Sequence, residues 1–312
     1  MNLWTVIINP WAGCGLGKTE WPGIKKLLIQ KGFEIKAFFT ERPSHAIEIV
    51  KDAVKKGCRK FIAVGGDGTL HEVINGAMFQ EEVPSTEITV GCIPVGSGND
   101  WIKLYGIPSD HAGAIDVIAA GNSRLQDLAL VKYKTETATD SRYMINVGGI
   151  LFDGNTVMEF TRIKTEEGSD GKKTYIRGLF NAFRKSSPCH VDMVADGKPF
   201  YSGKILSAAF GIGKYSGGGL MQTPGAEPDD GLLDMTVFKL TGKLKVICNA
   251  WRLFNGTILK FKDALHCQLK TLSLESAYPL NLEIDGENVG TTPFTIEMAP
   301  AAINVLAPAV SE

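Results

Sequence analysis

The residues best suited to chemistry stand in a glycine-rich stretch, residues 65–69, with the sequence GGDGT. Glycines lack a Cβ, so the backbone can adopt positive φ and bring its N–H groups close to phosphate oxygens. Asp67 places a negative charge among these donors. Mg²⁺ would allow this carboxylate and nucleotide phosphates to lie side by side, because the ion typically bridges the two. The stretch therefore predicts a nucleotide-binding loop. A plain strand-to-helix turn with Asp67 as N-cap is the alternative.

The residues around this loop predict the elements that position it. Residues 61–64 (FIAV) form a short apolar run with β-branched members, which is typical of a buried parallel strand. Glu72 follows in the first turn of a predicted helix, where the helix dipole favours an acid. The apolar residues of that helix recur at helical spacing: Leu70, Val73, Ile74 and Ala77.

Two further loops follow predicted strands. After residues 4–8, the stretch 9–19 (NPWAGCGLGKT) ends like a P-loop but has Ala12 where the first glycine is required. It still offers N–H donors and a lysine to phosphate. After residues 88–94, the loop 95–100 (VGSGND) is again glycine-rich with an acid. Ligands bind at the carboxyl ends of strands in open α/β sheets, so the loops can share one crevice.

The alternation of strands and helices in the first half predicts a doubly wound parallel sheet. From Lys132 onward the chain reads mostly as strands, so we expect a second, antiparallel β domain. Its predicted strands are 142–147, 190–194, 205–210, 233–238, 269–274, 280–284 and 295–298. We place the domains at 1–130, completed by 299–312, and at 131–298.

Composition narrows the class of protein. The chain has 312 residues, 44% hydrophobic and 21% charged, with a formal net charge of −1, which argues against nucleic-acid binding across its whole surface. No run is long enough to span a bilayer, and Asn9-Pro10 cuts short an N-terminal stretch without a basic region, so we expect no transmembrane segment and no secretory signal. Six scattered cysteines without a C-x-x-C pair fit reduced thiols in the cytosol.

Six segments in order resemble the diacylglycerol kinase catalytic-domain family, specifically the bacterial soluble lipid kinases, whose relatives include sphingosine and ceramide kinases. They are Asn9-Pro10 with the glycines after it, 65–76 (GGDGTLHEVING), 94–100 (PVGSGND), 146–153 (NVGGILFD), 217–234 and Asp285-Gly286-Glu287. GGDGT alone is shared with NAD kinases, but six motifs in this order are much more specific.

The resemblance implies an N-terminal α/β nucleotide domain like those of NAD kinases and diacylglycerol kinases, a C-terminal β-sandwich, and ATP with Mg²⁺ in the cleft between them. The residues implied near the nucleotide are Asn9, Thr40, Gly65, Gly66, Asp67, Gly68, Thr69, Glu72, Ser97, Asn99 and Asp100. Those implied to hold Mg²⁺ are Asp67, Asp100 and Asp127, with Asp230 at a second, structural or regulatory site. Lys103 stands where the family usually has arginine, which keeps the charge but loses the fork geometry.

Asp285 is implied as the general base, with Glu287 orienting it. Phosphoryl transfer needs positioning, charge neutralisation and one carboxylate to accept the hydroxyl proton. For three of the acids implied by the resemblance, a purely structural role in a turn stays open. Asp285-Gly286 is a common hairpin pair, Asp127 fits a strand-end turn, and Asp230 fits an acidic turn.

Two stretches, 172–185 (KKTYIRGLFNAFRK) and 243–262, combine a helical apolar face with basic residues, as membrane-contacting helices do. Trp251 and Phe254 belong to the apolar face of the second. The alternative is that each helix covers a sheet and leaves only a basic rim for anionic lipid.

We therefore expect a cytoplasmic ATP- and Mg²⁺-dependent lipid kinase that phosphorylates the hydroxyl of diacylglycerol or a related lipid, in peripheral contact with the inner membrane face. An NAD kinase is the enzyme alternative, and a nucleotide-gated lipid-binding protein without turnover is the alternative of another class. The sequence does not name the lipid, and it leaves a homodimer open.

Overall fold

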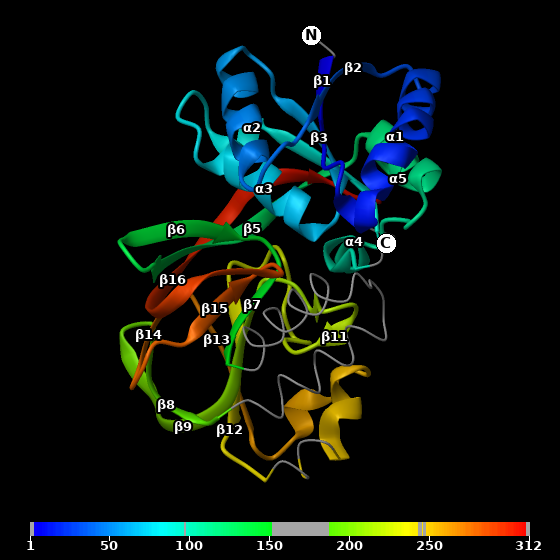
Figure 1. Ribbon diagram of the computed structural model, residues 1–312. Helices are drawn as coiled ribbons and strands as arrows, with labels where there is room; N and C mark the ends of the chain where they lie inside the picture. The colour runs from blue at the N-terminus through cyan, green and yellow to red at the C-terminus, as the bar shows by residue number, and fades with distance from the viewer. Residues whose placement is uncertain (1–2, 97, 152–186, 243–244, 246–247, 310–312) are drawn as a thin grey trace. The chain divides into compact units, whose positions relative to one another are not determined.

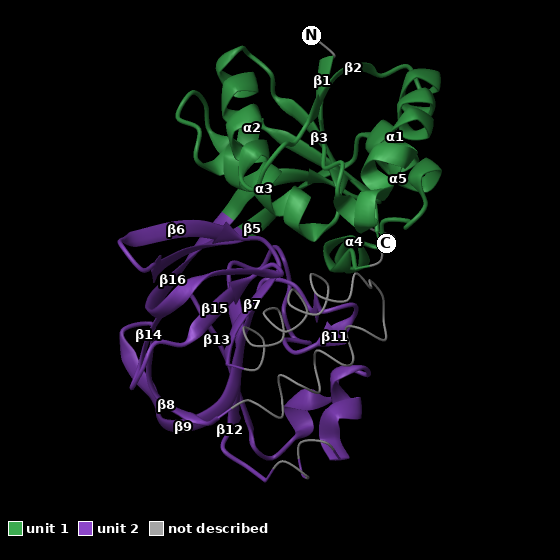
Figure 2. Cartoon of the chain, viewed as in Figure 1, with its two compact units in different colours: residues 1–127, 301–312 green, residues 128–300 purple. Residues whose placement is uncertain are grey.

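The computed structural model describes residues 3–96, 98–151, 187–242, 245 and 248–309. The chain divides into two compact units, residues 1–127 with 301–312 and residues 128–300 (Figure 2). Strand β16 (Glu287–Leu306) begins in the second unit and ends in the first.

The first unit alternates strands and helices, which confirms the α/β expectation for this half (Figure 1). Its other strands are β1 (Leu3–Ile8), β2 (Glu34–Phe39), β3 (Lys60–Gly65) and β4 (Thr89–Pro94). Its helices are α1 (Ala12–Gln30), α2 (His45–Lys55), α3 (Asp67–Met78), η1 (Ser85–Glu87), α4 (Asp100–Tyr105) and α5 (His111–Ala120). All its neighbouring strands pair in parallel, in the order β2-β1-β3-β4-β16.

The core of this unit explains why the strands read as continuous apolar runs. The last five residues of β1, β3 and β4 are all buried, as expected for strands covered on both faces. One core cluster joins β1, β3 and β4 to residues of α1 and α5, while α2 and α3 pack against each other. This frame brings the carboxyl ends of β1, β3 and β4 to one edge of the sheet.

The second unit is built from strands. They are β5 (Ser123–Lys134, whose first residues lie in the first unit), β6 (Thr139–Met144), β7 (Val147–Leu151), β8 (Cys189–Ala195), β9 (Lys198–Gly211), β10 (Tyr215–Ser216), β11 (Leu220–Met221), β12 (Leu233–Lys239), β13 (Ala264–Leu269), β14 (Thr271–Ser276), β15 (Asn281–Ile284) and most of β16. Two short 3-10 helices, η2 (Ala250–Leu253) and η3 (Ile258–Lys260), lie between β12 and β13. The β-rich C-terminal half is therefore confirmed.

The long strands of this unit do not pair as the two separate sheets of a β-sandwich. Strand β9 pairs with β12, β7 and β8, and β16 pairs with β15 and β14, while β7–β15 and β8–β14 link the two long strands. Apart from β10 and β11, which pair only with each other, these strands form one continuous antiparallel sheet that curls around its core (Figure 1). Its continuity comes from β9 and β16, with 14 and 20 residues, because each is long enough to pair with several strands along its length.

The two basic stretches have different outcomes. Residues 172–185 lie outside the described residues. Within 243–262, the described residues Lys245, Cys248 and Asn249 are helical and lead into η2, but a turn separates η2 from η3, so the expectation of one helix reaching residue 262 is wrong. Among the described helices, none is both long enough and apolar enough to cross a membrane.

Candidate functional site

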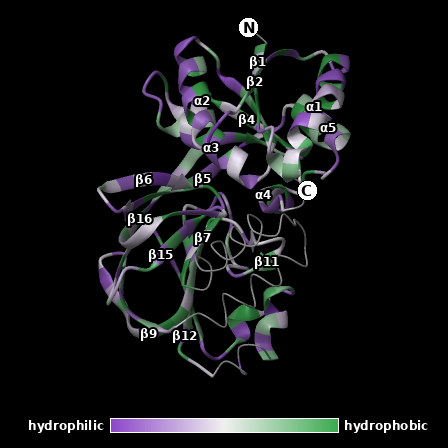
Figure 3. Cartoon of the chain, in the orientation of Figure 1, coloured by the Kyte–Doolittle hydropathy of each residue, from purple (hydrophilic) through white to green (hydrophobic). Residues whose placement is uncertain are grey.

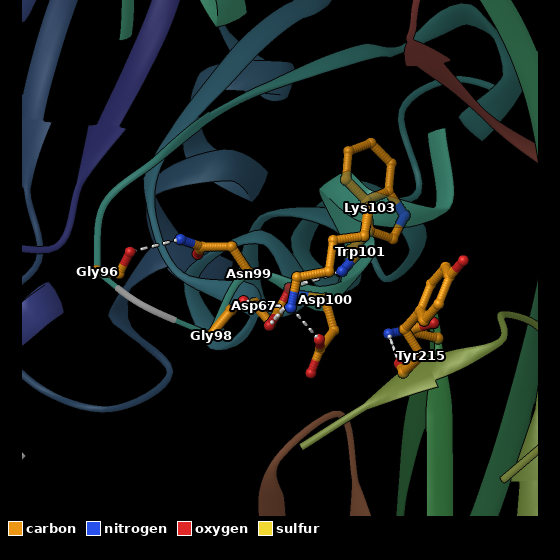
Figure 4. A network of polar contacts seen from close by, with 9 residues as sticks. Asp67, Gly96, Gly98, Asn99, Asp100, Trp101, Lys103 and Tyr215 are labelled. Atoms are coloured by element: carbon orange, nitrogen blue, oxygen red, sulfur yellow. Dashed lines mark hydrogen bonds and ion pairs between the residues drawn. The ribbon is translucent and has the colours of Figure 1, made fainter. Parts of the chain in front are cut away.

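Asp67 joins the loops that follow β3 and β4. Its Oδ2 accepts a hydrogen bond from the Asp100 backbone N–H at 2.9 Å, and its Oδ1 accepts one from the Trp101 N–H at 3.0 Å (Figure 4). These are the first two residues of α4, while Asp67 itself is the first residue of α3. The side chain therefore caps the neighbouring helix rather than its own, and its charge lies at two helix N-termini, where anions are favoured.

Lys103, on α4, bonds to the end of the loop that precedes this helix. Its Nζ lies 2.7 Å from Asp100 Oδ1 and 3.0 Å from the Gly98 carbonyl oxygen (Figure 4). The Asp100 side chain is only 7% exposed, whereas that of Lys103 is 38% exposed. The lysine thus supplies a cation beside a buried carboxylate and holds the end of the glycine-rich loop.

Asn99 shapes the same loop through its backbone. It has a φ of 48° in the left-handed region, which asparagine tolerates better than most residues, and its Nδ2 donates to the Gly96 carbonyl at 2.9 Å. Its side chain is buried. Ser97, expected beside it, lies outside the described residues.

The loop after β1 meets these two. Asn9 Nδ2 donates to Thr69 Oγ1 at 3.2 Å, and Asn9 Oδ1 accepts from the Trp11 N–H. A Cβ added to Gly13 would lie 3.0 Å from Gly96 Cα, so the loops after β1 and β4 also touch. All three strand-end loops are therefore in contact within the first unit.

The glycines of the GGDGT stretch act differently from our expectation. Gly65, Gly66 and Gly68 do not adopt positive φ. Gly65 is required for close packing, because a Cβ there would lie 2.3 Å from Thr69 Oγ1. The missing side chain lets the end of β3 pack directly on the first turn of α3, and Thr69 remains positioned to bond Asn9.

Glu72 and Thr40 lie around the loop after β2. Glu72 Oε1 accepts from the Ser44 N–H at 2.7 Å and Oε2 from the Ala46 N–H at 3.1 Å, so this carboxylate caps α2. The buried Thr40 donates its N–H to the Ile8 carbonyl. The described contacts make Glu72 a support for the segment after Thr40, and its contact with nucleotide stays a prediction.

The remaining predicted metal ligands have backbone partners. Asp127 is buried and accepts from the Ala301 N–H at 2.6 Å, which fixes the chain where it returns to the first unit. Asp230 is exposed and accepts from the Leu232 N–H at 2.9 Å, as in an Asx turn. Nowhere in the described part of the chain do three or more His, Cys, Asp or Glu side chains gather to hold a metal ion.

The charge of Asp67 affects its surroundings. Burial raises the pKa of the Cys92 thiol on β4, and the negative charge of Asp67 raises this pKa further. Cys92 is thus a neutral packing residue beneath the loops. Cys14 and Cys248 differ because they are exposed.

In the second unit, Asp285 occupies a tight turn between β15 and β16. Asp285 and Gly286 have φ of 51° and 88°, and Ile284 pairs with Glu287, as in a two-residue type I′ hairpin. The Asp285 side chain reaches the segment before β7, where three backbone N–H groups donate to it. The donors are Ile145 at 2.8 Å, Asn146 at 2.9 Å and Val147 at 3.2 Å. The turn interpretation is correct, and the same residue holds a fixed, buried carboxylate.

Two residues near Asp285 were not predicted. Glu283 is buried and accepts from the Gly286 N–H, and Asn146 Nδ2 donates to the Tyr215 carbonyl at 2.8 Å. Asn146 Oδ1 is buried with no hydrogen-bond partner among the described atoms. Asn146 stands in the NVGG segment, so its polar side chain before two glycines was the available signal. Glu287 is partly exposed at the start of β16.

Each of the two units matches a known protein family. Residues 3–131 match the family described as diacylglycerol kinase catalytic domain, and residues 154–307 match the YegS C-terminal NAD kinase beta sandwich-like domain. The two matches together cover most of the chain, and the one in the first unit is to the diacylglycerol kinase catalytic domain. The resemblance inferred from the six segments is thus confirmed.

Similar proteins span nearly the whole chain. Diacylglycerol kinases of Staphylococcus aureus strains JH9 and Newman are 28% identical over 311 residues, covering 97% of this chain and 91% of theirs. A crystal structure of a diacylglycerol kinase from Bacillus anthracis str. Sterne is 23% identical with a TM-score of 0.71, and a second structure from that organism is 25% identical with a TM-score of 0.78. Each alignment covers 98% of this chain and 97% of the other, and at 23% identity the first shows a shared fold alone.

The capping role of Asp67 predicts a measurable loss of stability. Asp67→Asn keeps one acceptor oxygen but turns an amide N–H₂ toward the Asp100 or Trp101 N–H, so one buried donor loses its partner. We expect the free energy of unfolding, measured by urea titration, to fall by about 1–3 kcal/mol.

Asp110→Asn is the matched control, because Asp110 caps α5 through one oxygen only, to the Gly113 N–H. Asparagine is as good an N-cap as aspartate, so that variant should change stability by less than about 0.5 kcal/mol. Equal effects of the two substitutions would contradict the double-cap assignment.

Proposed function

We propose that this protein is an ATP-dependent kinase that transfers the γ-phosphoryl group to the hydroxyl of diacylglycerol or a related lipid. The observation that carries the proposal is the Asp67 network, which fastens two strand-end loops into one polar edge. That edge belongs to a chain whose similar proteins, over 97% of its length, are named diacylglycerol kinase.

The nucleotide would lie on the three loops of the first unit. Their backbone N–H groups and the N-terminus of α3 favour phosphate oxygens, whereas the first N–H groups of α4 already donate to Asp67. Polar side chains at the same edge, including Asn9, Thr69 and Asn99, are positioned by the contacts described above. Lys103 adds a partly exposed positive charge beside this edge.

The carboxylates of this edge fit Mg²⁺ by their chemistry. Asp67 and Asp100 present hard oxygen donors on adjacent loops, joined through the Asp100 N–H. Mg²⁺ usually binds one or two carboxylates together with substrate phosphates and water, so a cage of three protein ligands is not required. When bound, the ion would neutralise charge on the phosphates. Asp127, and Asp230 at a separate site, remain proposed ligands.

Asp285 is the proposed general base. It would accept the proton of the lipid hydroxyl as the hydroxyl oxygen bonds to the γ-phosphorus and the bond to the ADP oxygen breaks. The three backbone donors fix the orientation of its carboxylate, as a positioned base requires. Glu287 is the proposed supporting acid, and Asn146 Oδ1 offers an acceptor for a donor on the substrate.

An NAD kinase remains the second candidate for a specific reason. The GGDGT stretch is shared with that class, and the family matching residues 154–307 is described as NAD kinase beta sandwich-like. A nucleotide-gated lipid-binding protein without turnover is the candidate of another class. We propose action from the cytoplasmic face of a membrane, where ATP is present; a homodimer stays a prediction.

A direct assay separates these candidates. Purified protein incubated with labelled ATP, Mg²⁺ and detergent-dispersed diacylglycerol should transfer label to the lipid, whereas NAD⁺ in a parallel incubation should remain unlabelled. Labelled NAD⁺ with untouched lipid would establish the NAD kinase instead. Lipid and nucleotide binding without label transfer to either acceptor would establish the binding protein.

Substituting the proposed base tests its role. Asp285→Asn should lower kcat at least about a hundredfold, because general-base catalysis typically contributes 10²–10⁴-fold. ATP affinity, measured by calorimetry, should change little. Near-normal turnover would remove Asp285 as base.

Asp196→Asn is the matched control. Asp196-Gly197 also forms a two-residue turn with positive φ, and Asp196 also accepts two backbone N–H bonds. It lies outside the family segments and is exposed. Its substitution should leave kcat unchanged, and melting temperatures of both variants will show whether lost turnover reflects lost folding.

Glu72 provides a test of support against direct contact. Glu72→Ala removes both bonds to α2, so we expect a stability loss of about 0.5–2 kcal/mol, a severalfold rise in the KM for ATP, and kcat within about twofold. Glu48→Ala, which removes only an exposed ion pair with Arg42, is the control. A large fall in kcat would instead indicate direct contact with the reacting phosphates.

A further inference from the structure

The connection between β12 and β13 is far longer than the strands require. These neighbours pair antiparallel, and a two-residue turn can join such strands. The chain instead makes an excursion over residues 240–263, whose base is closed by the bond from the Lys239 N–H to the Asp263 carbonyl at 2.9 Å. Loops of this length in compact domains are usually functional.

The second part of the excursion is anchored to the domain. Ile258 and Phe261 are 3% and 6% exposed. Lys245 pairs with Asp263, and its Nζ lies 5.6 Å from the centre of the Phe261 ring. These contacts give the excursion a fixed base, so the side chains that it leaves outside are held at a defined place on the surface.

Two aromatic side chains of the same excursion remain exposed. Trp251 is 52% exposed and Phe254 is 63% exposed, among the highest values for large apolar residues in the described chain. They are three residues apart, and the Phe254 N–H donates to the Trp251 carbonyl at the end of η2. Side chains at i and i+3 of a 3-10 helix lie on the same side, and Phe254 directly follows η2 with helical backbone angles, so we expect the two rings to share one side and call them the aromatic pair.

Basic residues surround this pair in the sequence. Residues 239–263 contain six basic residues and one acid, within a chain whose net charge is −1. The Arg252 guanidinium lies 4.9 Å from the Trp251 ring centre, and Lys260 and Lys262 are exposed. Figure 3 shows hydrophobic and hydrophilic residues side by side on the η2 and η3 segment, which is yellow to orange in Figure 1.

We propose that the aromatic pair, with Arg252, Lys260 and Lys262 as its basic rim, docks on an anionic lipid surface. The inference rests on the proposed function, because a kinase whose substrate is a lipid must reach it in a membrane. Aromatic residues with basic neighbours suit the boundary between headgroups and acyl chains, and each basic residue near an anionic leaflet adds to binding. This surface belongs to described residues and contains no proposed catalytic group.

Vesicle co-sedimentation of the full chain tests the aromatic pair. Trp251→Ala with Phe254→Ala should lower partitioning to vesicles of phosphatidylglycerol and phosphatidylcholine by at least about tenfold. Tyr278→Ala, at a 47% exposed aromatic on the β14–β15 turn, should have no effect. Equal partitioning of the double variant and wild type would overturn the proposal. So would a wild-type dimer in ultracentrifugation that the double variant loses, because the pair would then serve self-association.

Charge and activity give independent readouts. Lys260→Glu with Lys262→Glu should weaken binding at least about tenfold on anionic vesicles but not on pure phosphatidylcholine, since each lysine contributes about fivefold. In kinase assays the aromatic double variant should lose activity on vesicles and keep it on short-chain, monomeric diacylglycerol. Equal loss on both substrates would overturn the docking role. If wild type phosphorylates no lipid, the proposed function fails, while the vesicle comparison still decides whether this surface binds lipid.

Discussion

The first unit depends on one half-buried carboxylate, that of Asp67, placed where two helices begin. The helix α4 has only six residues, too few to be stable alone, so its first N–H groups need a partner from elsewhere. Asp67 supplies that partner, and the capped helix buries Trp101, whose Nε1 donates to Gln126. The next residue, Asp127, holds the backbone of Ala301. Loop geometry and the return of the chain are thus coupled through neighbouring hydrogen bonds.

The local sequence pattern was sufficient to predict the strands of the first unit, but it was insufficient to predict how the strands of the second unit pair. The apolar runs at 4–8, 61–64 and 88–94 became β1, β3 and β4 because strands covered on both faces leave that signal. In the second unit, the single curled sheet arises because β9 and β16 pair with several distant strands. Such pairing is non-local, and no periodicity within one strand specifies it. The 243–262 stretch failed similarly, since helical spacing alone did not show which apolar residues the domain would bury.

The motifs singled out residues without predicting the contacts that those residues make. Gly65 was singled out for positive φ, yet it is needed because Thr69 packs against the position of its absent Cβ. Glu72 belongs to the same motif but bonds the start of α2. Glu283 escaped notice because one acid in an alternating strand resembles any solvent-facing residue, although it is buried beside the turn. A motif gives the identity of a residue, whereas the packing in the structure shows why that residue is required.

Asp285 combines a structural role in its turn with the chemical role proposed above. Asparagine is the residue that type I′ turns favour most before glycine, so the turn alone gives no reason for a carboxylate. Asp196 shows that an exposed aspartate in the same kind of turn can collect backbone donors at the surface. Asp285 collects three donors while only 7% exposed, and burying a charge costs far more than leaving it in water. Forming the turn does not require this buried charge. The proposed role as general base would explain it, because a base must be held in one orientation, away from bulk water, to receive a proton.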